Sequence, residues 1–143
     1  MKPLSPDILK TSVIAVPPLA RDADLTLNRA ENQHIISHIE SGGVSVLLYG
    51  GNAVLYHIAP SHYEALLDML SQLASPSTVV IPSVGPAYGV MMDQAKILNQ
   101  SGFATAMILP QKEISTSAGI ARAVRDFCQA AQRSVVLYIK HDN

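Results

Sequence analysis

The chain has 143 residues, of which 48% are hydrophobic and 15% are charged, and its formal net charge at pH 7 is −1. These values indicate one globular domain with its own core, and they give no reason to expect a nucleic-acid or membrane partner. The single cysteine, Cys128, excludes an intrachain disulfide. Because no apolar segment resembles a signal peptide or a membrane span, we expect a cytoplasmic protein.

Five short apolar segments occur along the chain, each rich in β-branched residues and bounded by Gly or Pro or by the chain end. They predict buried strands of a parallel sheet, since continuous apolar runs are typical of strands that are covered on both faces. In chain order the predicted strands are residues 12–16, 44–49, 78–81, 105–109 and 134–139.

Amphipathic segments separate these strands, and each carries one apolar stripe at helical spacing. We expect the first helix over about residues 28–40, a start at Pro60 for the second, a stop at Gly102 for the third, and a cap at Ser115 or Thr116 for the fourth. The four stripes are Ile35, Ile36 and Ile39; Tyr63, Leu66, Leu67 and Leu70; Met91, Ala95 and Leu98; and Ile120, Val124, Phe127 and Ala131.

The predicted order is a repeated βα unit with strands roughly thirty residues apart. Right-handed crossovers then place the helices outside a parallel sheet. Two architectures fit this order. One is a flavodoxin-like doubly wound sheet, complete at five strands, and the other is part of a (β/α)₈ barrel, which takes about 250 residues. Composition does not separate them.

A longer pattern gives a more specific indication. Residues 39–53 form a glycine-ended helix, a strand and a Gly-Gly-Asn loop. The ends of the other four predicted strands lie, in chain order, at residues 15–19, 81–85, 109–110 and 136–138. This series resembles the dihydrodipicolinate synthase / N-acetylneuraminate lyase family of class I aldolases. The resemblance implies an α/β fold with a parallel sheet, namely a partial (β/α)₈ barrel that contains about the first five strands and four helices. It also implies that residues 1–143 form a single, N-terminal half-barrel domain.

The same resemblance implies a reaction and a site. Members of the family are lyases or synthases in which a lysine on the sixth strand forms a Schiff base with a 2-keto acid such as pyruvate. The loop after the second strand binds the substrate carboxylate, and a tyrosine ending the fifth strand moves protons. Carried over, this makes Tyr138 catalytic and assigns carboxylate binding to Gly50, Gly51 and Asn52. It implies a small 2-keto acid as partner, a homo-oligomer, and no cofactor or metal.

The sequence departs from the family at several positions. Gly51 and Asn52 stand where the family has two threonines, Val54 replaces a glutamate, and Gln111 and Lys112 replace paired tyrosines. The sixth strand and its lysine do not follow, so we expect a truncated chain that is inactive alone. Lys140 is expected to point to the same sheet face as Tyr138. A solvated lysine at that position stays protonated near neutral pH, so it is a poor nucleophile.

Other reactive side chains have simpler interpretations. His34 and His38 have the i, i+4 spacing of a zinc pair but lack further ligands, so they are expected to pack or to lie on the surface. His57 and His62 flank the loop after the second strand, where a surface role is also expected. Cys128 falls on the stripe of the last helix and is expected to be a small core residue rather than a nucleophile.

Two non-enzymatic functions stay open beside the lyase. A half-barrel has two open sheet edges and, we expect, an exposed apolar interior face, both of which favour self-association. Alternatively, a flavodoxin-like sheet would be a binding module complete at five strands, and it requires the first strand to lie in the middle of the sheet.

Overall fold

The computed structural model describes residues 5–111 and 114–139. Its strands form one sheet, all of whose neighbouring strands are parallel, in the order β1-β2-β3-β4-β5. They are β1 (Ile14–Ala15), β2 (Val46–Tyr49), β3 (Val79–Val84), β4 (Ala106–Ile108) and β5 (Val135–Leu137). This sequential order is the order of a barrel. The flavodoxin-like alternative is therefore wrong, because it places the first strand inside the sheet.

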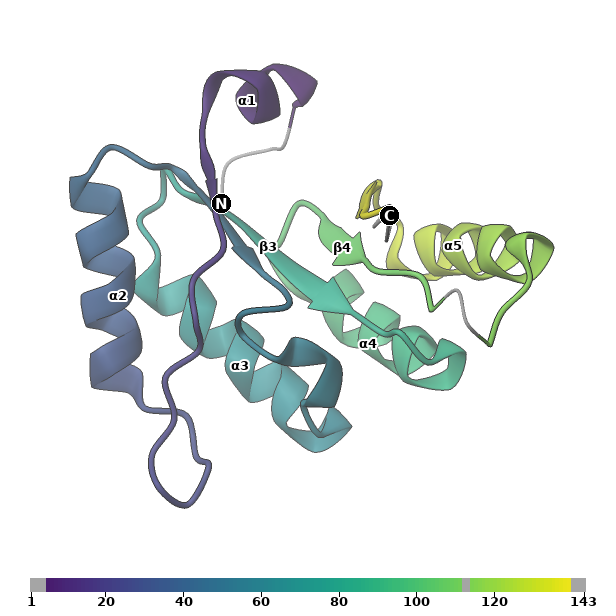
Figure 1. Cartoon of the computed structure of the whole chain (residues 1–143), viewed down its shortest axis with the longest axis horizontal. Coiled ribbons are helices and arrows are strands. Elements are labelled where there is room, and N and C mark those ends of the chain that lie inside the picture. Colours follow the sequence, from purple (N-terminus) through teal and green to yellow (C-terminus); the bar gives the residue numbers. More distant parts are fainter. Residues whose placement is uncertain (1–4, 112–113, 140–143) are drawn as a thin grey trace.

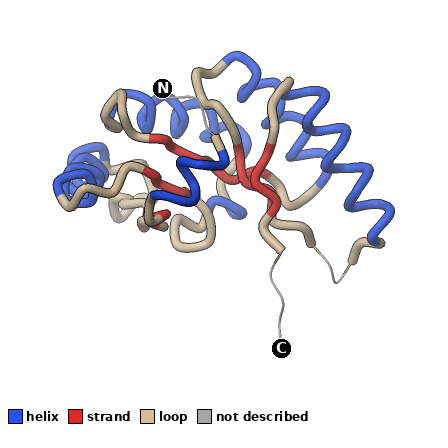
Figure 2. Tube along the Cα trace, turned by 90° about the horizontal axis from the view of Figure 1, so that it is seen from above, coloured by secondary structure: helices blue, strands red, loops and turns tan. Residues whose placement is uncertain are grey.

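Four long helices follow one another around one side of the sheet (Figure 1), and the view from above shows the strands at the centre (Figure 2). They are α2 (Arg29–Ser41), α3 (Pro60–Leu73), α4 (Tyr88–Gln100) and α5 (Ser117–Ala131). Two short helices were not predicted: α1 (Pro6–Thr11) precedes β1, and the 3₁₀ turn η1 (Leu55–His57) follows β2. In the described part of the chain, no helix is both long and apolar enough to cross a membrane.

The helix starts agree with the sequence signals. The Asn28 side chain accepts a hydrogen bond from the Glu31 backbone N–H at 2.9 Å, and Thr116 accepts one from Gly119 at 3.1 Å. Pro60 occupies the first turn of α3, where its missing N–H costs nothing. Helix α4 stops just before Gly102, as predicted, with Ser101 as its C-terminal cap. Ser101 ends the helix in extended conformation, and its hydroxyl donates to the Leu98 carbonyl at 2.7 Å.

Strand β3 continues beyond its predicted end. The expectation that Pro82 closes it is wrong: Pro82 pairs with Tyr49 of β2, and the strand runs on to Val84. Proline lacks a backbone donor, but its fixed φ is compatible with extended structure. The chain turns at Gly85, the second residue expected to close this strand, whose φ of +79° favours glycine.

Two apolar clusters cover the two faces of the sheet. The larger lies between the sheet and the long helices, and it includes all of the predicted stripe of α3. The smaller lies on the opposite, inner face and consists of Val46, Leu48, Val79, Ile81 and Met107, with Ile8 and Leu9 of α1 packed against it.

The expectation of an exposed interior face is therefore wrong. The most exposed of the five inner-face side chains, Leu48, is only 9% exposed. The unpredicted helix α1 buries part of the inner face, because its side chains Ile8 and Leu9 pack against that face of the sheet. Exposed apolar surface remains at the two sheet edges, at Val13, Ile14 and Val16 beside β1 and at 137–139 beside β5.

Candidate functional site

A cavity of about 410 Å³ opens at the carboxyl end of the sheet. Sites of parallel α/β proteins lie at this end, where loops follow the strands. The wall is mainly apolar, with an amide and two phenols as its polar side chains. The described residues that line it are Val16, Leu48, Gly51, Asn52, Tyr56, Met107, Leu109 and Tyr138.

The loop after β2 forms one wall of this cavity. Gly50 is buried beneath the loop, and a Cβ there would lie 2.9 Å from Leu48 Cδ2 and 2.9 Å from Met107 Cε. Those distances are too short for carbon atoms, so any larger residue here would force the flexible ends of the Leu48 and Met107 side chains to move. Gly51 lines the cavity and Gly50 supports it from below.

Asn52 fastens this loop to the first strand. Its amide nitrogen, Nδ2, donates a hydrogen bond to the Val16 carbonyl at 3.0 Å. This bond fixes the loop relative to the end of β1, and both residues line the cavity. The assignment of carboxylate binding to Gly50, Gly51 and Asn52 stays a prediction.

Tyr138 lies where the sequence places it, directly after β5 and in the wall of the cavity. Its backbone N–H donates to the Ile108 carbonyl at 2.9 Å, which extends the pairing of β5 with β4. The side chain is half exposed. The structure therefore brings Tyr138 together with Gly51 and Asn52, although they come from distant parts of the sequence.

Tyr56 is a member of this site that the sequence analysis missed. It lies in η1, is partly buried, and lines the cavity. Burial raises the pKa of its phenol, and the negative charge of an ionised Tyr138 raises it further. No local sequence pattern marks this tyrosine, so only the structure identifies it as part of the cavity wall.

The remaining sequence candidates lie elsewhere. Lys140 falls outside the described residues. His34 and His38 are exposed on α2, and among the described residues no group of three His, Cys, Asp or Glu side chains is placed to hold a metal. His57 and His62 border a separate cavity of about 600 Å³.

Cys128, expected to be a small core residue, is partly buried on α5. Burial raises the pKa of its thiol and so disfavours the thiolate.

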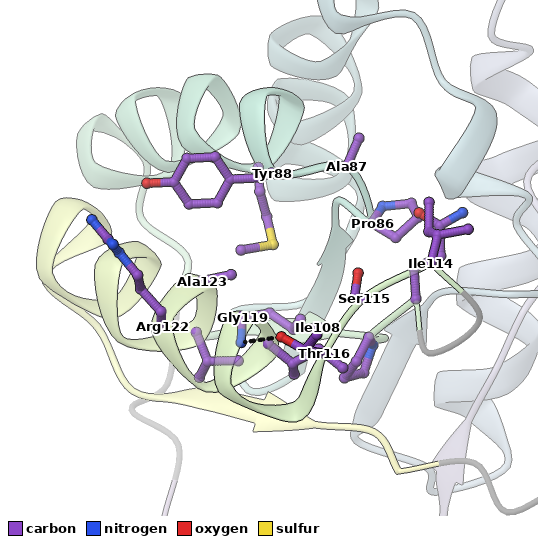
Figure 3. A pocket seen from close by; sticks show the side chains of 15 residues that line it. Pro86, Ala87, Tyr88, Ile108, Ile114, Ser115, Thr116, Gly119, Arg122 and Ala123 are labelled. Carbon is purple, nitrogen blue, oxygen red and sulfur yellow. Dashed lines mark hydrogen bonds between the residues drawn. The ribbon is translucent and has the colours of Figure 1, made fainter.

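A third cavity, of about 570 Å³, lies between the ends of β3 and β4 and the starts of α4 and α5 (Figure 3). Its ionisable lining groups in the described chain are Tyr88 and Arg122, and both contact Asp126: the Tyr88 hydroxyl donates at 3.1 Å, and Arg122 Nε is 3.5 Å from the carboxylate. With these groups engaged and an otherwise mostly apolar wall, this cavity is suited to binding rather than to proton transfer.

No protein-family model matches the sequence, and no curated protein matches it. Solved structures do. Dihydrodipicolinate synthase from Bacillus clausii superposes with a TM-score of 0.79 at 17% identity, over 91% of this chain and 45% of that one. N-acetylneuraminate lyase (sialic acid aldolase) from Aliivibrio salmonicida gives 0.82 at 15% identity, over 96% and 46%. Dihydrodipicolinate synthase from Rhodopseudomonas palustris gives 0.73 at 20% identity, over 88% and 43%.

The chain spans a little under half the length of these proteins. At these identities the likeness concerns the fold, and it agrees with the sequential parallel strands and their outer helices. The resemblance inferred from the sequence is thus confirmed at the level of the fold: the chain has the partial (β/α)₈ architecture of the N-terminal half of dihydrodipicolinate synthase and N-acetylneuraminate lyase.

Proposed function

We propose that this chain forms the 2-keto-acid-binding half of a class I aldolase-type lyase, and that the substrate occupies the cavity beside Tyr138. One observation carries the proposal. Gly51, Asn52 and Tyr138, which the family resemblance selected from sequence, line one cavity at the carboxyl end of the sheet.

The cavity offers what a small keto acid needs. Backbone N–H groups of the Gly-Gly-Asn loop can bind the carboxylate, as loops before helices bind anions. The apolar walls at Leu48 and Leu109 exclude water and strengthen those hydrogen bonds. The phenol of Tyr138 exchanges a proton with the keto oxygen, which is general acid–base catalysis.

A Schiff base needs an amine that the described cavity wall does not contain. The described lysines lie on other elements: Lys10 on α1, and Lys96 on α4, where its Nζ is 2.9 Å from Asp93. We therefore propose that the 143 residues alone bind the keto acid without forming a covalent adduct, and that a lysine from outside them completes the reaction.

Binding and adduct formation can be tested on the 143-residue chain. Calorimetry should detect pyruvate binding, and borohydride treatment followed by mass spectrometry should find no reduced adduct on any lysine. Acetate, which lacks the keto group, is the matched ligand and should bind more weakly. Absence of pyruvate binding would contradict the proposed function. An adduct mapped to Lys140 would overturn the proposal that the chain alone is inactive.

A second candidate function is assembly with another copy of the chain. The observation that favours it is the exposed apolar surface at both sheet edges, where Val13 is 70% exposed and Ile139 is 57% exposed. Open edges of this kind promote strand pairing, and the β5 edge of one copy can continue the parallel sheet at the β1 edge of another.

Light scattering after size-exclusion chromatography tests this assembly. The chain should elute as a dimer, and a double substitution of Val13→Lys and Ile139→Lys should give a monomer with unchanged helix content. Tyr88→Lys, a change at an exposed residue of α4 away from both sheet edges, is the control and should leave the dimer intact. A wild-type monomer at high concentration would contradict self-association.

A further inference from the structure

The wall of the cavity beside Tyr138 has a polar rim and an apolar floor. Gly51, Asn52 and Tyr138 follow the last residues of β2 and β5, so they lie at the mouth, where the strands have ended. Leu48 and Met107 lie within β2 and β4 themselves. Because depth in a parallel sheet follows chain position along each strand, these two side chains form the floor.

The floor is closely packed and can adapt its shape. The Leu48 Cδ2 and Met107 Cε atoms each lie 2.9 Å from where a Cβ of Gly50 would be, so both side chains end beneath the loop after β2. Leu109, which follows β4, packs against the same inner-face cluster and also lines the cavity. Methionine is flexible and polarisable, so this floor can fit itself around an alkyl chain.

The cavity is larger than pyruvate, and its wall offers no charge to a second acidic group. Its volume is about 410 Å³. A three-carbon acid fills well under half of that space, at about 30 Å³ or less for each non-hydrogen atom. Among the described residues of the wall there is no Lys, Arg, His, Asp or Glu. A second carboxylate would therefore lose water without gaining a counter-ion, whereas an alkyl chain is stabilised by leaving water.

We infer that the site selects 2-keto acids whose aliphatic chain is longer than that of pyruvate. The carboxylate lies at the rim, and the chain lies on Leu48, Met107 and Leu109, which thereby determine specificity. This inference rests on the proposed function and deepens it, because it names the kind of 2-keto acid. The same floor disfavours an acid of equal length that ends in a second carboxylate.

Calorimetry with a series of ligands tests the inference on the 143-residue chain. From pyruvate to 2-oxobutanoate to 2-oxopentanoate, each added methylene should strengthen binding about fourfold, the effect of burying it. 2-Oxoglutarate has the chain length of 2-oxopentanoate and a second carboxylate, and it should bind about tenfold more weakly. The inference is overturned if 2-oxopentanoate binds no more tightly than pyruvate, or if 2-oxoglutarate binds as tightly as 2-oxopentanoate.

A variant with a charged wall should reverse the preference. Leu109→Lys adds a cation to the wall, so 2-oxoglutarate should then bind more tightly than 2-oxopentanoate. Leu25→Lys is the matched control, because Leu25 is exposed and borders a separate cavity, and it should keep the wild-type order of affinities. A folded Leu109→Lys protein, judged by circular dichroism, that keeps the wild-type order contradicts the assignment of Leu109.

Methyl NMR locates the chain with no charged variant. In wild-type protein labelled at its methionine methyl groups, the conservative substitution Met107→Leu identifies the Met107 signal. 2-Oxopentanoate should shift this signal, and pyruvate should leave it almost unchanged because it is too short to reach the floor. A Met107 signal that does not move at saturating 2-oxopentanoate overturns the placement of the chain.

Failure of the inference is distinguishable from failure of the proposed function. If pyruvate binds and chain length has no effect, the proposed function stands and the inference alone is overturned. If no 2-keto acid of the series binds, the proposed function fails and the inference fails with it.

Discussion

The amide of Asn52 and the carbonyl of Val16 are joined by a hydrogen bond of 3.0 Å across 36 positions of sequence. The bond connects the loop after β2 with the end of β1, so it sets the position of one cavity wall. The side chain that the family resemblance selected for ligand binding thus also has a structural role.

Asn52→Ala should therefore affect stability and binding together. Loss of this hydrogen bond should cost about 0.5–1.5 kcal/mol of unfolding free energy, and pyruvate should bind more weakly because the loop is no longer fixed. Urea unfolding and calorimetry measure the two effects. Asn99→Ala, on the exposed surface of α4, is the control and should be neutral. Unchanged stability in Asn52→Ala would show that the loop holds its position without this bond.

Gly50→Ala should disturb the cavity from below. The new methyl group would lie 2.9 Å from Leu48 Cδ2 and Met107 Cε, so both side-chain ends must move. Because these atoms are the far ends of flexible side chains, we expect a cost of about 1 kcal/mol, at the low end for overpacking. Since both line the cavity, pyruvate binding should weaken as well.

Gly89→Ala is the matched control, because no atom lies within 4 Å of the added Cβ. It should leave binding unchanged and should be neutral or slightly stabilising, since alanine favours a helix over glycine. Equal unfolding midpoints for the two variants would contradict the tight packing under Gly50.

Tyr49 and Tyr63 are both fully buried, but their hydroxyls differ. The Tyr63 hydroxyl donates to the Ser83 carbonyl at 3.2 Å, whereas the Tyr49 hydroxyl finds no hydrogen-bond partner among the described residues. Tyr63→Phe should therefore lose about 1 kcal/mol, and Tyr49→Phe should be neutral or stabilising. Chemical denaturation of both variants checks this. The opposite ranking would show that the Tyr49 hydroxyl is hydrogen-bonded in solution.

Cys128 should react slowly in the folded chain. Burial raises the pKa of its thiol, so at pH 7 less of it is the reactive thiolate than in the unfolded chain. As the pH rises through the folded-state pKa, the rates of the folded and unfolded chains should converge. Maleimide labelling followed by mass spectrometry measures both rates, and the single cysteine makes the site unambiguous. Faster labelling of the folded chain at pH 7 would contradict this prediction.

Much of the fold could be predicted from local features of the sequence. The five apolar runs located every strand, and Asn28, Pro60 and Thr116 marked three helix starts. Capping and side-chain periodicity act between residues a few positions apart, so a single sequence contains them. Strand ends were less well predicted: β1 is only two residues long and β3 passes through Pro82, because pairing with neighbouring strands decides where a strand ends.

The site was partly predictable. The family resemblance selected Gly51, Asn52 and Tyr138, and all three line the cavity. Tyr56 was missed because no local pattern distinguishes a tyrosine in a 3₁₀ turn from one on the surface. The cover of the inner face by Ile8 and Leu9 was missed for a similar reason, since six helical residues carry too short a stripe to show which face they bury.

The sequence by itself determined the alternation of strands and helices along the chain, the helix caps and the apolar stripes by which the helices face the sheet, because these depend on short-range backbone and side-chain preferences. Only the tertiary structure decided that neighbouring strands in the sheet follow the chain order and that α1 covers the inner face. It alone also showed that Tyr56 and Tyr138 line one cavity. Those relationships join distant segments, and the packing of the whole sheet against its helices sets the distances between them.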